Sequence, residues 1–233
     1  MPLWVFLFPL FLMSCSTSRP PEADKSPPAE EETVVLLHGM GRTRLSMIVL
    51  SQRFRRAGYQ TVNFPYNQAG RSLDQLSDGL IEFIEEQVKT PRYHLIAHSL
   101  GNVIIRDAFR KEFPTGLGRI VMLAPPNHPA HLAKRLKKNL LYRLITGDSG
   151  QKLSEEEFYA ALPIPSVEFG VIAGNKGQKI TFSEPNDGLV AVETTKLEGM
   201  SDFIVLNHAH TFIMNGKDTF DHCREFIEKG SFQ

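Results

Sequence analysis

Residues 93–102 read YHLIAHSLGN and carry the strongest local structural signal in the sequence. The short apolar run Tyr93–Ala97 predicts a buried strand, and the residues Leu100–Phe113 predict a helix. Between them, Ser99 has a small residue two positions away on either side, Ala97 and Gly101. Small residues at these positions allow a tight strand-to-helix turn whose backbone passes close to its neighbours. We therefore expect Ser99 to lie at the end of a strand and at the amino terminus of a helix.

The alternation of strand and helix continues along the chain in both directions. Short apolar or β-branched runs predict six strands, at residues 33–37, 59–64, 93–97, 119–124, 167–173 and 203–206. Apolar residues at helical spacing predict helices at residues 44–57, 73–88, 100–113 and 219–229, the second opened by a capping box of Ser72 and Gln75. This order predicts an α/β fold, with a mostly parallel sheet covered by helices on both faces. Ligands of such sheets bind at the carboxyl ends of the strands, so functional residues are expected there.

The composition is that of an ordinary globular domain. The 233 residues are 42% hydrophobic, and 26 Lys and Arg balance 26 Asp and Glu. Because there is no basic excess, nucleic acid is not expected as a partner. No Cys/His cluster has the spacing of metal ligands, so no metal site is expected. The two cysteines, Cys15 and Cys223, could pair on number alone, but Cys15 has a better explanation, given below.

The pentapeptide Ala97–Gly101 resembles the G-x-S-x-G nucleophile elbow, with alanine in the first glycine position. In such a turn the serine Oγ is exposed above the sheet, and the helix amino terminus favours negative charge that develops nearby. The alternative is a serine that only caps a helix after a buried strand, which is common.

A second turn, with the sequence LHGMG (Leu37–Gly41), ends the first predicted strand. Acyl transfer requires fixed N–H groups that stabilise the oxyanion of the tetrahedral intermediate. Proteins with a nucleophile elbow take one N–H from the residue after the nucleophile, here Leu100, and another from the loop after an early strand, here Met40. The alternative is a plain glycine-rich turn.

An acid and a base for Ser99 are expected in the second half of the chain. Asp187 follows the strand at residues 167–173 and would hold an imidazole in the correct tautomer, although an Asp-Gly turn is also common there. His208 and His210 both follow the last strand, and His210 lies farther into the loop, with more freedom to reach Ser99. We therefore expect His210 to be the base and Asp187 the acid, with Asp202 as the next candidate acid. The His-x-His pair lacks an evident third ligand for a metal.

These segments together resemble the lipase-like α/β-hydrolases, and most closely the small bacterial triacylglycerol lipases and the GPI inositol-deacylase-like branch. The resemblance covers nearly the whole predicted domain. It implies a minimal α/β-hydrolase fold without the two antiparallel strands that open larger members, and hydrolysis of carboxylic esters without a cofactor. It also places the base at the histidine before Thr-Phe, which is His210. The matching segments are VVLLHGMGRT (34–43), LIAHSLGN (95–102), VMLAPPN (121–127), GVIAGN (170–175), NDGLV (186–190) and HTF (210–212).

An insertion of about forty residues, at about 128–165, separates two of the predicted strands. Residues 130–146 carry leucines at every fourth position among several lysines and arginines, which predicts an amphipathic helix. This helix either packs on the sheet as a connection or forms a cap over the active site that could contact an anionic lipid surface.

The first thirty residues are not expected to belong to the folded domain. The apolar run at residues 2–13 is too short to span a bilayer and fits a signal peptide at residues 1–14. The end of that run, Leu12-Met13-Ser14-Cys15, resembles the bacterial lipobox, which implies cleavage before Cys15 and lipid on its sulfur. Residues 15–32 are proline-rich and lack large apolar side chains, which predicts a disordered tether before a domain at residues 33–233. An ordinary signal peptide or an uncleaved anchor are the alternatives.

Together these features predict a serine esterase or lipase, or an acyltransferase, that is held by a lipid anchor at a membrane of the bacterial cell envelope. The expected partners are an ester or lipid substrate and the membrane. Two other functions fit the same sequence. One is a lipid-anchored binding module that keeps the fold without catalysis, and the other is hydrolysis of amides or thioesters, which the same three side chains can perform.

Overall fold

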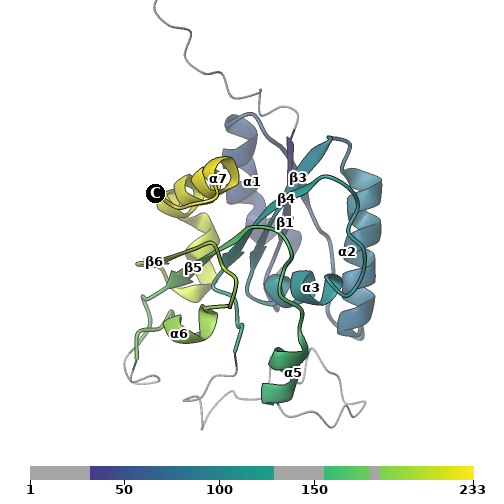
Figure 1. Cartoon of the computed structure of the whole chain (residues 1–233). Helices are drawn as coiled ribbons and strands as arrows, with labels where there is room; N and C mark the ends of the chain where they lie inside the picture. Colours follow the sequence, from purple (N-terminus) through teal and green to yellow (C-terminus); the bar gives the residue numbers. More distant parts are fainter. Residues whose placement is uncertain (1–31, 129–154, 179–183) are drawn as a thin grey trace, which may run out of the picture.

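The chain folds around an open six-stranded sheet in which every strand is parallel to its neighbours (Figure 1). The computed structural model describes residues 32–128, 155–178 and 184–233. The order of the strands across the sheet is β2-β1-β3-β4-β5-β6. The strands are β1 (Glu32–Leu37), β2 (Gln60–Asn63), β3 (Arg92–His98), β4 (Leu117–Leu123), β5 (Phe169–Gly174) and β6 (Asp202–Leu206).

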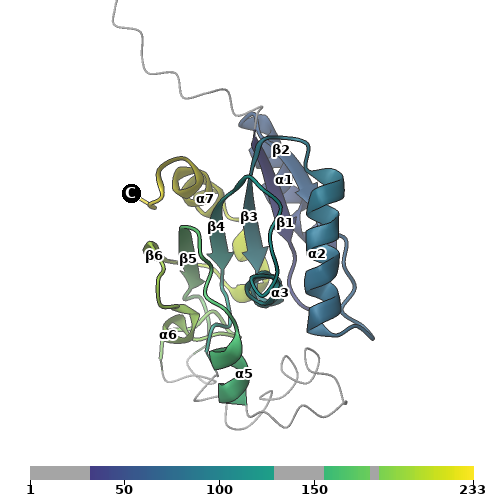
Figure 2. The ribbon, with the colours of Figure 1, turned by 45° about the vertical axis from the view of Figure 1, so that its right-hand side comes forward.

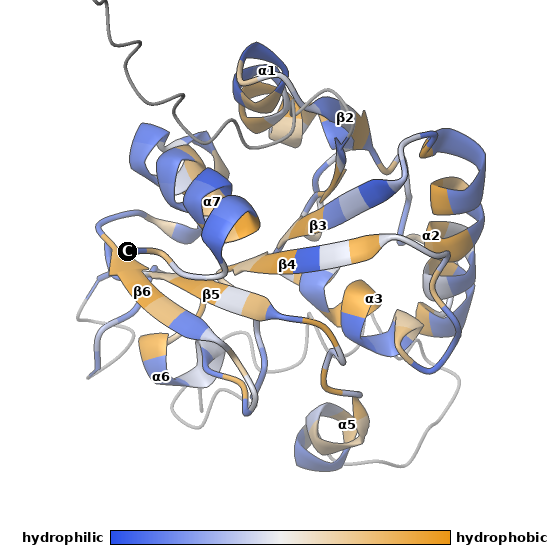
Figure 3. Cartoon of the chain, turned by 45° about the horizontal axis from the view of Figure 1, so that its top comes forward, coloured by the Kyte–Doolittle hydropathy of each residue, from blue (hydrophilic) through white to orange (hydrophobic). Residues whose placement is uncertain are grey.

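Helices cover both faces of the sheet, as Figures 1 and 2 show. Alternate residues of one strand point to opposite faces. In β1, Val35 and Leu37 therefore join the core on one face, while Val34 and Leu36 join the core on the other. The first core is closed by α2 (Leu73–Gln87) and α3 (Leu100–Ala108), and the second by α1 (Ile48–Arg56) and α7 (Lys217–Lys229). In Figure 3, β5 and β6 are largely hydrophobic and β3 and β4 are mixed, whereas the helices carry many hydrophilic residues.

The strand order places a topological switch point between β1 and β3. The chain leaves β1 toward the α1 face and leaves β3 toward the α3 face, so the loops after these neighbouring strands diverge. A crevice outside the carboxyl ends of the strands is expected at such a point. The arrowheads in Figure 2 point to the end of the sheet at which α5 (Glu155–Ala161) and α6 (Val192–Thr195) lie. The predicted α/β class, the six strands and the two covered faces are thus confirmed.

Several predicted boundaries differ from the structure. The helix expected at 44–57 is divided into the 3-10 helix η2 (Arg44–Met47) and α1. The helix expected at 100–113 ends at Ala108, and residues 109–111 continue as turns whose N–H groups bond three residues back. Pro114 follows Phe113, and the residue before a proline is disfavoured in the α region, so the helix is not expected to include Phe113. The capping box of Ser72 and Gln75 is present as predicted.

The predicted signal peptide, the tether with Cys15, and the leucine-rich segment at residues 130–146 lie outside the described residues. Cys223 is buried in the core on the α7 face, where burial raises the pKa of its thiol. None of the helices in residues 32–128, 155–178 and 184–233 combines the length and the apolar character that a membrane crossing requires. In the same ranges, no three His, Cys, Asp or Glu side chains gather as metal ligands would.

Candidate active site

Ser99 lies in a strained turn between β3 and α3. Its backbone has φ 51° and ψ −117°, a conformation that non-glycine residues rarely adopt. The turn is held by hydrogen bonds to its neighbours. The Ser99 N–H donates to the Leu123 carbonyl at 3.0 Å, and Asn102 Nδ2 donates to the carbonyls of both Ser99 and Leu123 at 3.2 Å. Asn102 was not singled out from the sequence, because an asparagine in the first turn of a helix is unremarkable there.

The small residues around Ser99 are required by the packing of the turn. A Cβ on Gly101 would lie 2.9 Å from the His38 carbonyl oxygen and 2.9 Å from Leu37 Cβ. Such contacts are closer than side chains tolerate, so the helix after Ser99 can approach β1 only if residue 101 is glycine. The sequence predicted a tight turn for the same reason, because small residues let its backbone pass close to its neighbours.

His210 reaches Ser99 from the far end of the chain. It begins the 3-10 helix η3 (His210–Asn215), which follows β6, and its ring is buried. Its Nε2 lies 2.9 Å from Ser99 Oγ, and its Nδ1 lies 2.7 Å from Asp187 Oδ2. Because a carboxylate can only accept, Nδ1 carries the proton, and Nε2 accepts from the serine hydroxyl.

Asp187 is fixed by the turn that it begins. Its Oδ1 accepts hydrogen bonds from the N–H groups of Leu189 and Val190, at 2.9 and 2.7 Å. Its own carbonyl accepts from the His210 N–H at 2.9 Å, so the acid and the base are joined through the backbone as well as through their side chains. The carboxylate is buried, and these donors replace the water that it loses.

The loop after β1 faces the turn at Ser99, as the close approach of Gly101 to the His38 carbonyl indicates. Within the described residues, the backbone N–H groups of Met40 and Leu100 have no hydrogen-bond acceptor. His38 anchors this loop, since its ring stacks on Tyr66 at 4.0 Å and its carbonyl accepts from the Tyr66 hydroxyl at 2.5 Å. Burial lowers the pKa of His38 and raises that of Tyr66, so both rings are neutral.

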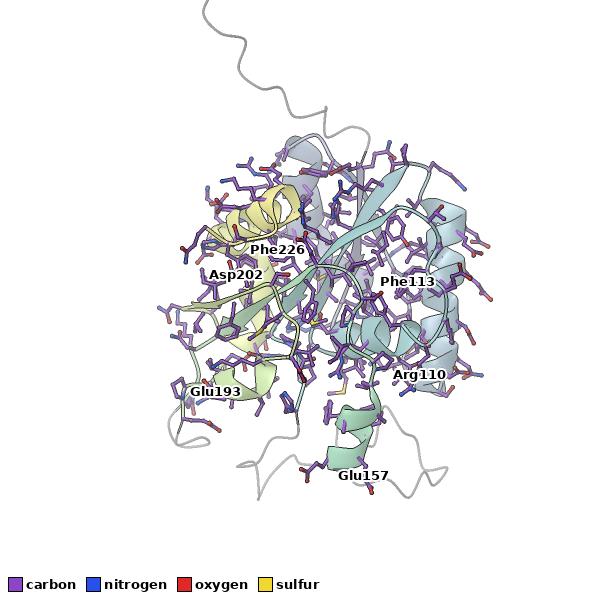
Figure 4. The ribbon with its side chains drawn as sticks, in the orientation of Figure 1. Arg110, Phe113, Glu157, Glu193, Asp202 and Phe226 are labelled. Carbon is purple, nitrogen blue, oxygen red and sulfur yellow. The ribbon has the colours of Figure 1, made fainter. Side chains whose placement is uncertain are left out.

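The two alternative residues considered from the sequence lie elsewhere. His208 Nε2 is 2.7 Å from Asp218 Oδ1, at the start of α7, and does not contact Ser99. Asp202 lies at the amino end of β6, where its carboxylate accepts from the N–H groups of Phe203 and Phe232. Figure 4 shows Asp202 near Phe226 of α7. The structure therefore brings together Ser99, His210 and Asp187, and neither alternative.

Arg106, which was not singled out from the sequence, joins α3 to Asn127, which precedes the insertion, and to the end of α5 within it. It is buried, and burial lowers the pKa of its guanidinium to about 10. It has no carboxylate partner among the described residues. Instead it donates to Asn127, before the insertion, and to three carbonyls at the end of α5, those of Tyr159, Leu162 and Pro163. This fixes the position of α5 relative to the helix that follows Ser99.

Comparison with known proteins supports the fold and goes no further. No protein-family model matches the sequence, and no curated protein is detectably similar to it. Among solved structures, esterase B from Lactobacillus rhamnosis, in a tributyrin phosphonate complex, is 14% identical with a TM-score of 0.60, and the match covers 88% of this chain and 77% of that one. Methylketone synthase I from tomato is 12% identical with a TM-score of 0.59, over 85% of this chain and 98% of that one.

A lipase-esterase related protein from Clostridium acetobutylicum is 14% identical with a TM-score of 0.57, over 84% of this chain and 95% of that one. Identities this low establish architecture alone. In this chain that architecture is an open parallel sheet with helices on both faces, and Ser99 lies in a strained turn after its third strand. The chain therefore has the α/β-hydrolase fold.

Proposed function

We propose that this protein is a serine hydrolase that cleaves carboxylic esters through an acyl-enzyme, with Ser99, His210 and Asp187 as its catalytic triad. The observation that carries the proposal is the continuous chain of hydrogen bonds from Ser99 Oγ to His210 Nε2 (2.9 Å) and from His210 Nδ1 to Asp187 Oδ2 (2.7 Å). A nucleophile, a base and an orienting carboxylate within hydrogen-bond distance form the arrangement that activates a serine.

The chemistry follows from the acceptors and donors in this chain. Ser99 Oγ attacks the ester carbonyl carbon while His210 Nε2 takes the hydroxyl proton, and Asp187 stabilises the imidazolium that results. The backbone N–H groups of Met40 and Leu100, which bond to no acceptor among the described residues, would donate to the oxyanion. His210 then gives its proton to the departing alkoxide, which leaves the acyl group on Ser99. A water molecule, deprotonated by His210, attacks the acyl carbonyl, and Ser99 recovers its proton as the acid leaves.

A fluorophosphonate probe tests the nucleophile directly. We expect Ser99 Oγ to displace fluoride from the probe's phosphorus, so that the protein gains the mass of the probe less hydrogen fluoride, and the Ser99→Ala variant to gain none, because the probe reacts with activated serines. The competing proposal, a non-catalytic binding module with the same fold, predicts no reaction of the wild-type protein. An unmodified Ser99 in a folded wild-type protein would reject the proposed function.

The class of substrate is tested with matched compounds. Esters are favoured over amides or thioesters because esterase B, a structural neighbour, is described as inhibited by a tributyrin phosphonate. A series of p-nitrophenyl esters of increasing chain length would give the preferred acyl group. The corresponding anilide and thioester would measure the alternative activities. Faster turnover of the anilide or thioester than of every ester would contradict ester hydrolysis as the main activity.

We further propose that Cys15 is the first residue of the mature protein and carries lipid, which anchors the domain to a membrane of the bacterial cell envelope. The support is the apolar run that ends in Leu-Met-Ser-Cys and the proline-rich stretch after it. Intact mass spectrometry of the protein from membranes should give an amino terminus at Cys15 with added acyl mass. Cys15→Ser should block processing or release the protein. A mature Cys15 without lipid would refute the anchor and leave the hydrolase proposal intact.

A further inference from the structure

His98, which immediately precedes Ser99, contacts the segment that carries the base. Its Nε2 lies 2.9 Å from the backbone carbonyl oxygen of His210. Because a carbonyl only accepts, Nε2 is the nitrogen that carries the proton. The two rings lie beside each other, with centroids 4.8 Å apart. Ser99 therefore contacts the imidazole of His210, and His98, the last residue of β3, bonds to the backbone of the same histidine.

The ring of His98 also supports the loop after β1. A Cβ added to Gly39 would lie 2.6 Å from His98 Nδ1 and 3.3 Å from Ser99 Cβ. The loop that carries Met40 thus packs closely against the ring of His98, and residue 39 must be glycine for it to do so. A single buried side chain is in contact with the segments that carry the nucleophile, the base and one proposed oxyanion donor.

A histidine at this position lowers the stability of the fold relative to an apolar side chain. His98 is buried, and its Nδ1 has no hydrogen-bond partner among the described residues. Burial, with the nearby His210, holds the pKa of His98 well below its ordinary value, so the ring stays neutral. An unsatisfied buried acceptor is unfavourable, and an apolar side chain would avoid it. The compensating feature is the bond from Nε2 to the His210 carbonyl.

His94 on the same strand provides the contrast. It is equally buried, and burial lowers its pKa to about 3. Both of its ring nitrogens have partners, with Glu32 at 3.3 Å from Nε2 and the Arg119 N–H at 2.9 Å from Nδ1. His94 therefore joins strands at the amino end of the sheet, whereas His98 joins the segments at the carboxyl end.

We propose that His98 is a positioning residue, whose Nε2–H holds the carbonyl of His210 so that the imidazole faces Ser99. The effect on turnover rests on the proposed function, but the effect on the His210–Asp187 contact does not. Glutamine at residue 98 places an N–H near the position of Nε2, asparagine places one near Nδ1, and leucine supplies none. His94→Gln is the matched control, because it changes a buried histidine of the same strand.

The steady-state test separates positioning from folding. We expect His98→Leu and His98→Asn to lower kcat by about 10- to 100-fold, the effect of one unsatisfied buried carbonyl on the reacting geometry, with KM changed by less than about threefold. His98→Gln should recover kcat to within about threefold of the wild type. His94→Gln should lower the melting temperature without lowering kcat. A folded His98→Leu with normal kcat, or a His98→Gln as impaired as His98→Leu, would overturn the proposal.

A spectroscopic readout keeps the test independent of catalysis. The imidazole N–H that His210 donates to Asp187 should give a far-downfield proton resonance in the NMR spectrum. We expect this resonance to be shifted or lost in His98→Leu and His98→Asn, and retained in His98→Gln and His94→Gln. An unchanged resonance in folded His98→Leu would refute the positioning role. If the wild-type protein does not react with fluorophosphonates, the proposed function is wrong. The NMR measurement still decides the role of His98 in that case.

Discussion

The loop after β6 carries two histidines, His208 and His210, and each pairs with an aspartate at 2.7 Å. The pairs differ in their surroundings. The side chains of His210 and Asp187 are 7% and 1% exposed, whereas those of His208 and Asp218 are 25% and 50% exposed. Only the first pair touches Ser99. Two contacts with the same chemistry and length, two residues apart in sequence, therefore have different consequences.

We infer that burial and a third partner, rather than the His–Asp contact itself, distinguish the proposed catalytic pair from the other pair. A partly exposed pair is screened by water and contributes little to stability. The buried pair loses its water, and its carboxylate is compensated by the N–H groups of Leu189 and Val190. His208 instead joins its loop to the first turn of α7.

The sharpest test of the comparison exchanges each histidine for alanine. His210→Ala should lower kcat by 10⁴-fold or more, on the order of the loss of a triad member. His208→Ala should change kcat far less, because only a partly exposed pair is lost. The measurement is turnover of a short-chain p-nitrophenyl ester by both folded variants. Equal losses, or the larger loss at residue 208, would mean that the wrong histidine has been assigned as the base.

The next test makes the same exchange at the two acids. Asp187→Asn should lower kcat by about 10⁴-fold with the fold intact, because an amide cannot stabilise the imidazolium and selects the wrong tautomer. Asp218→Asn should keep most of the activity. Circular dichroism and kcat of both variants decide the outcome. Near-normal turnover of a folded Asp187→Asn would show that another carboxylate serves as the acid.

Gly174, at the end of β5, lies between the two pairs. A Cβ there would be 2.5 Å from the His208 carbonyl oxygen and 2.9 Å from Asp187 Cβ, so Gly174→Ala should push the two loops apart. We expect a loss of about 1–3 kcal/mol in the free energy of unfolding, together with a lower kcat. Gly79→Ala, within α2, is the control, since its Cβ would lie 3.7 Å from Phe64 Cζ, an ordinary contact, and should stabilise the helix by about 0.5–1 kcal/mol. Gly174→Ala as stable and active as the wild type would contradict this close contact.

The smallest expected effect is the pH dependence of the exposed pair. Partial burial acts to raise the pKa of Asp218, but hydrogen bonds from His208 and the Thr219 N–H outweigh it, so the pKa in the folded protein lies below its ordinary value. A lowered pKa contributes stability above the pKa of the unfolded chain and loses it as the pH falls through the folded value. The advantage of the wild type over Asp218→Asn in free energy of unfolding, at most about 1 kcal/mol, should therefore shrink between about pH 5 and pH 2. A gap that widens with acidity would contradict the pairing.

The fold was predictable because its signals are local. Alternating buried residues in the strands and the capping box of Ser72 and Gln75 depend on near neighbours in sequence, and both are present as predicted. The helix after Ser99 ends at Ala108, before the predicted end at Phe113, and Pro114 disfavours helical geometry only at Phe113. The short helices α5 and α6 were not predicted, because they depend on tertiary contacts such as those from Arg106 to the carbonyls of Tyr159 and Leu162 at the end of α5.

The three residues of the candidate site could be predicted from the sequence, but the residues that hold them in place could not. Chain order and the positions at the ends of predicted strands led us to expect from the sequence that Ser99, Asp187 and His210 lie near one another. His98 and Asn102 could not be recognised in the same way. His98 is distinguished by a hydrogen bond to the carbonyl of His210, 112 residues away, and Asn102 by hydrogen bonds to the carbonyls of Ser99 and Leu123. A sequence identifies reacting atoms by their chemistry, whereas the groups that hold them are ordinary residues in particular places.

Because φ is positive at Ser99, selection for stability and selection for activity favour different residues at this position. A non-glycine residue in such a conformation costs on the order of 1–3 kcal/mol, and glycine would relieve most of that cost while removing Oγ. The sequence that folds best and the sequence that can react are therefore not the same sequence. If Ser99 is the nucleophile, as proposed, a library of variants selected for heat resistance alone would enrich chains that lack it, and only a screen that also demands turnover would keep the serine.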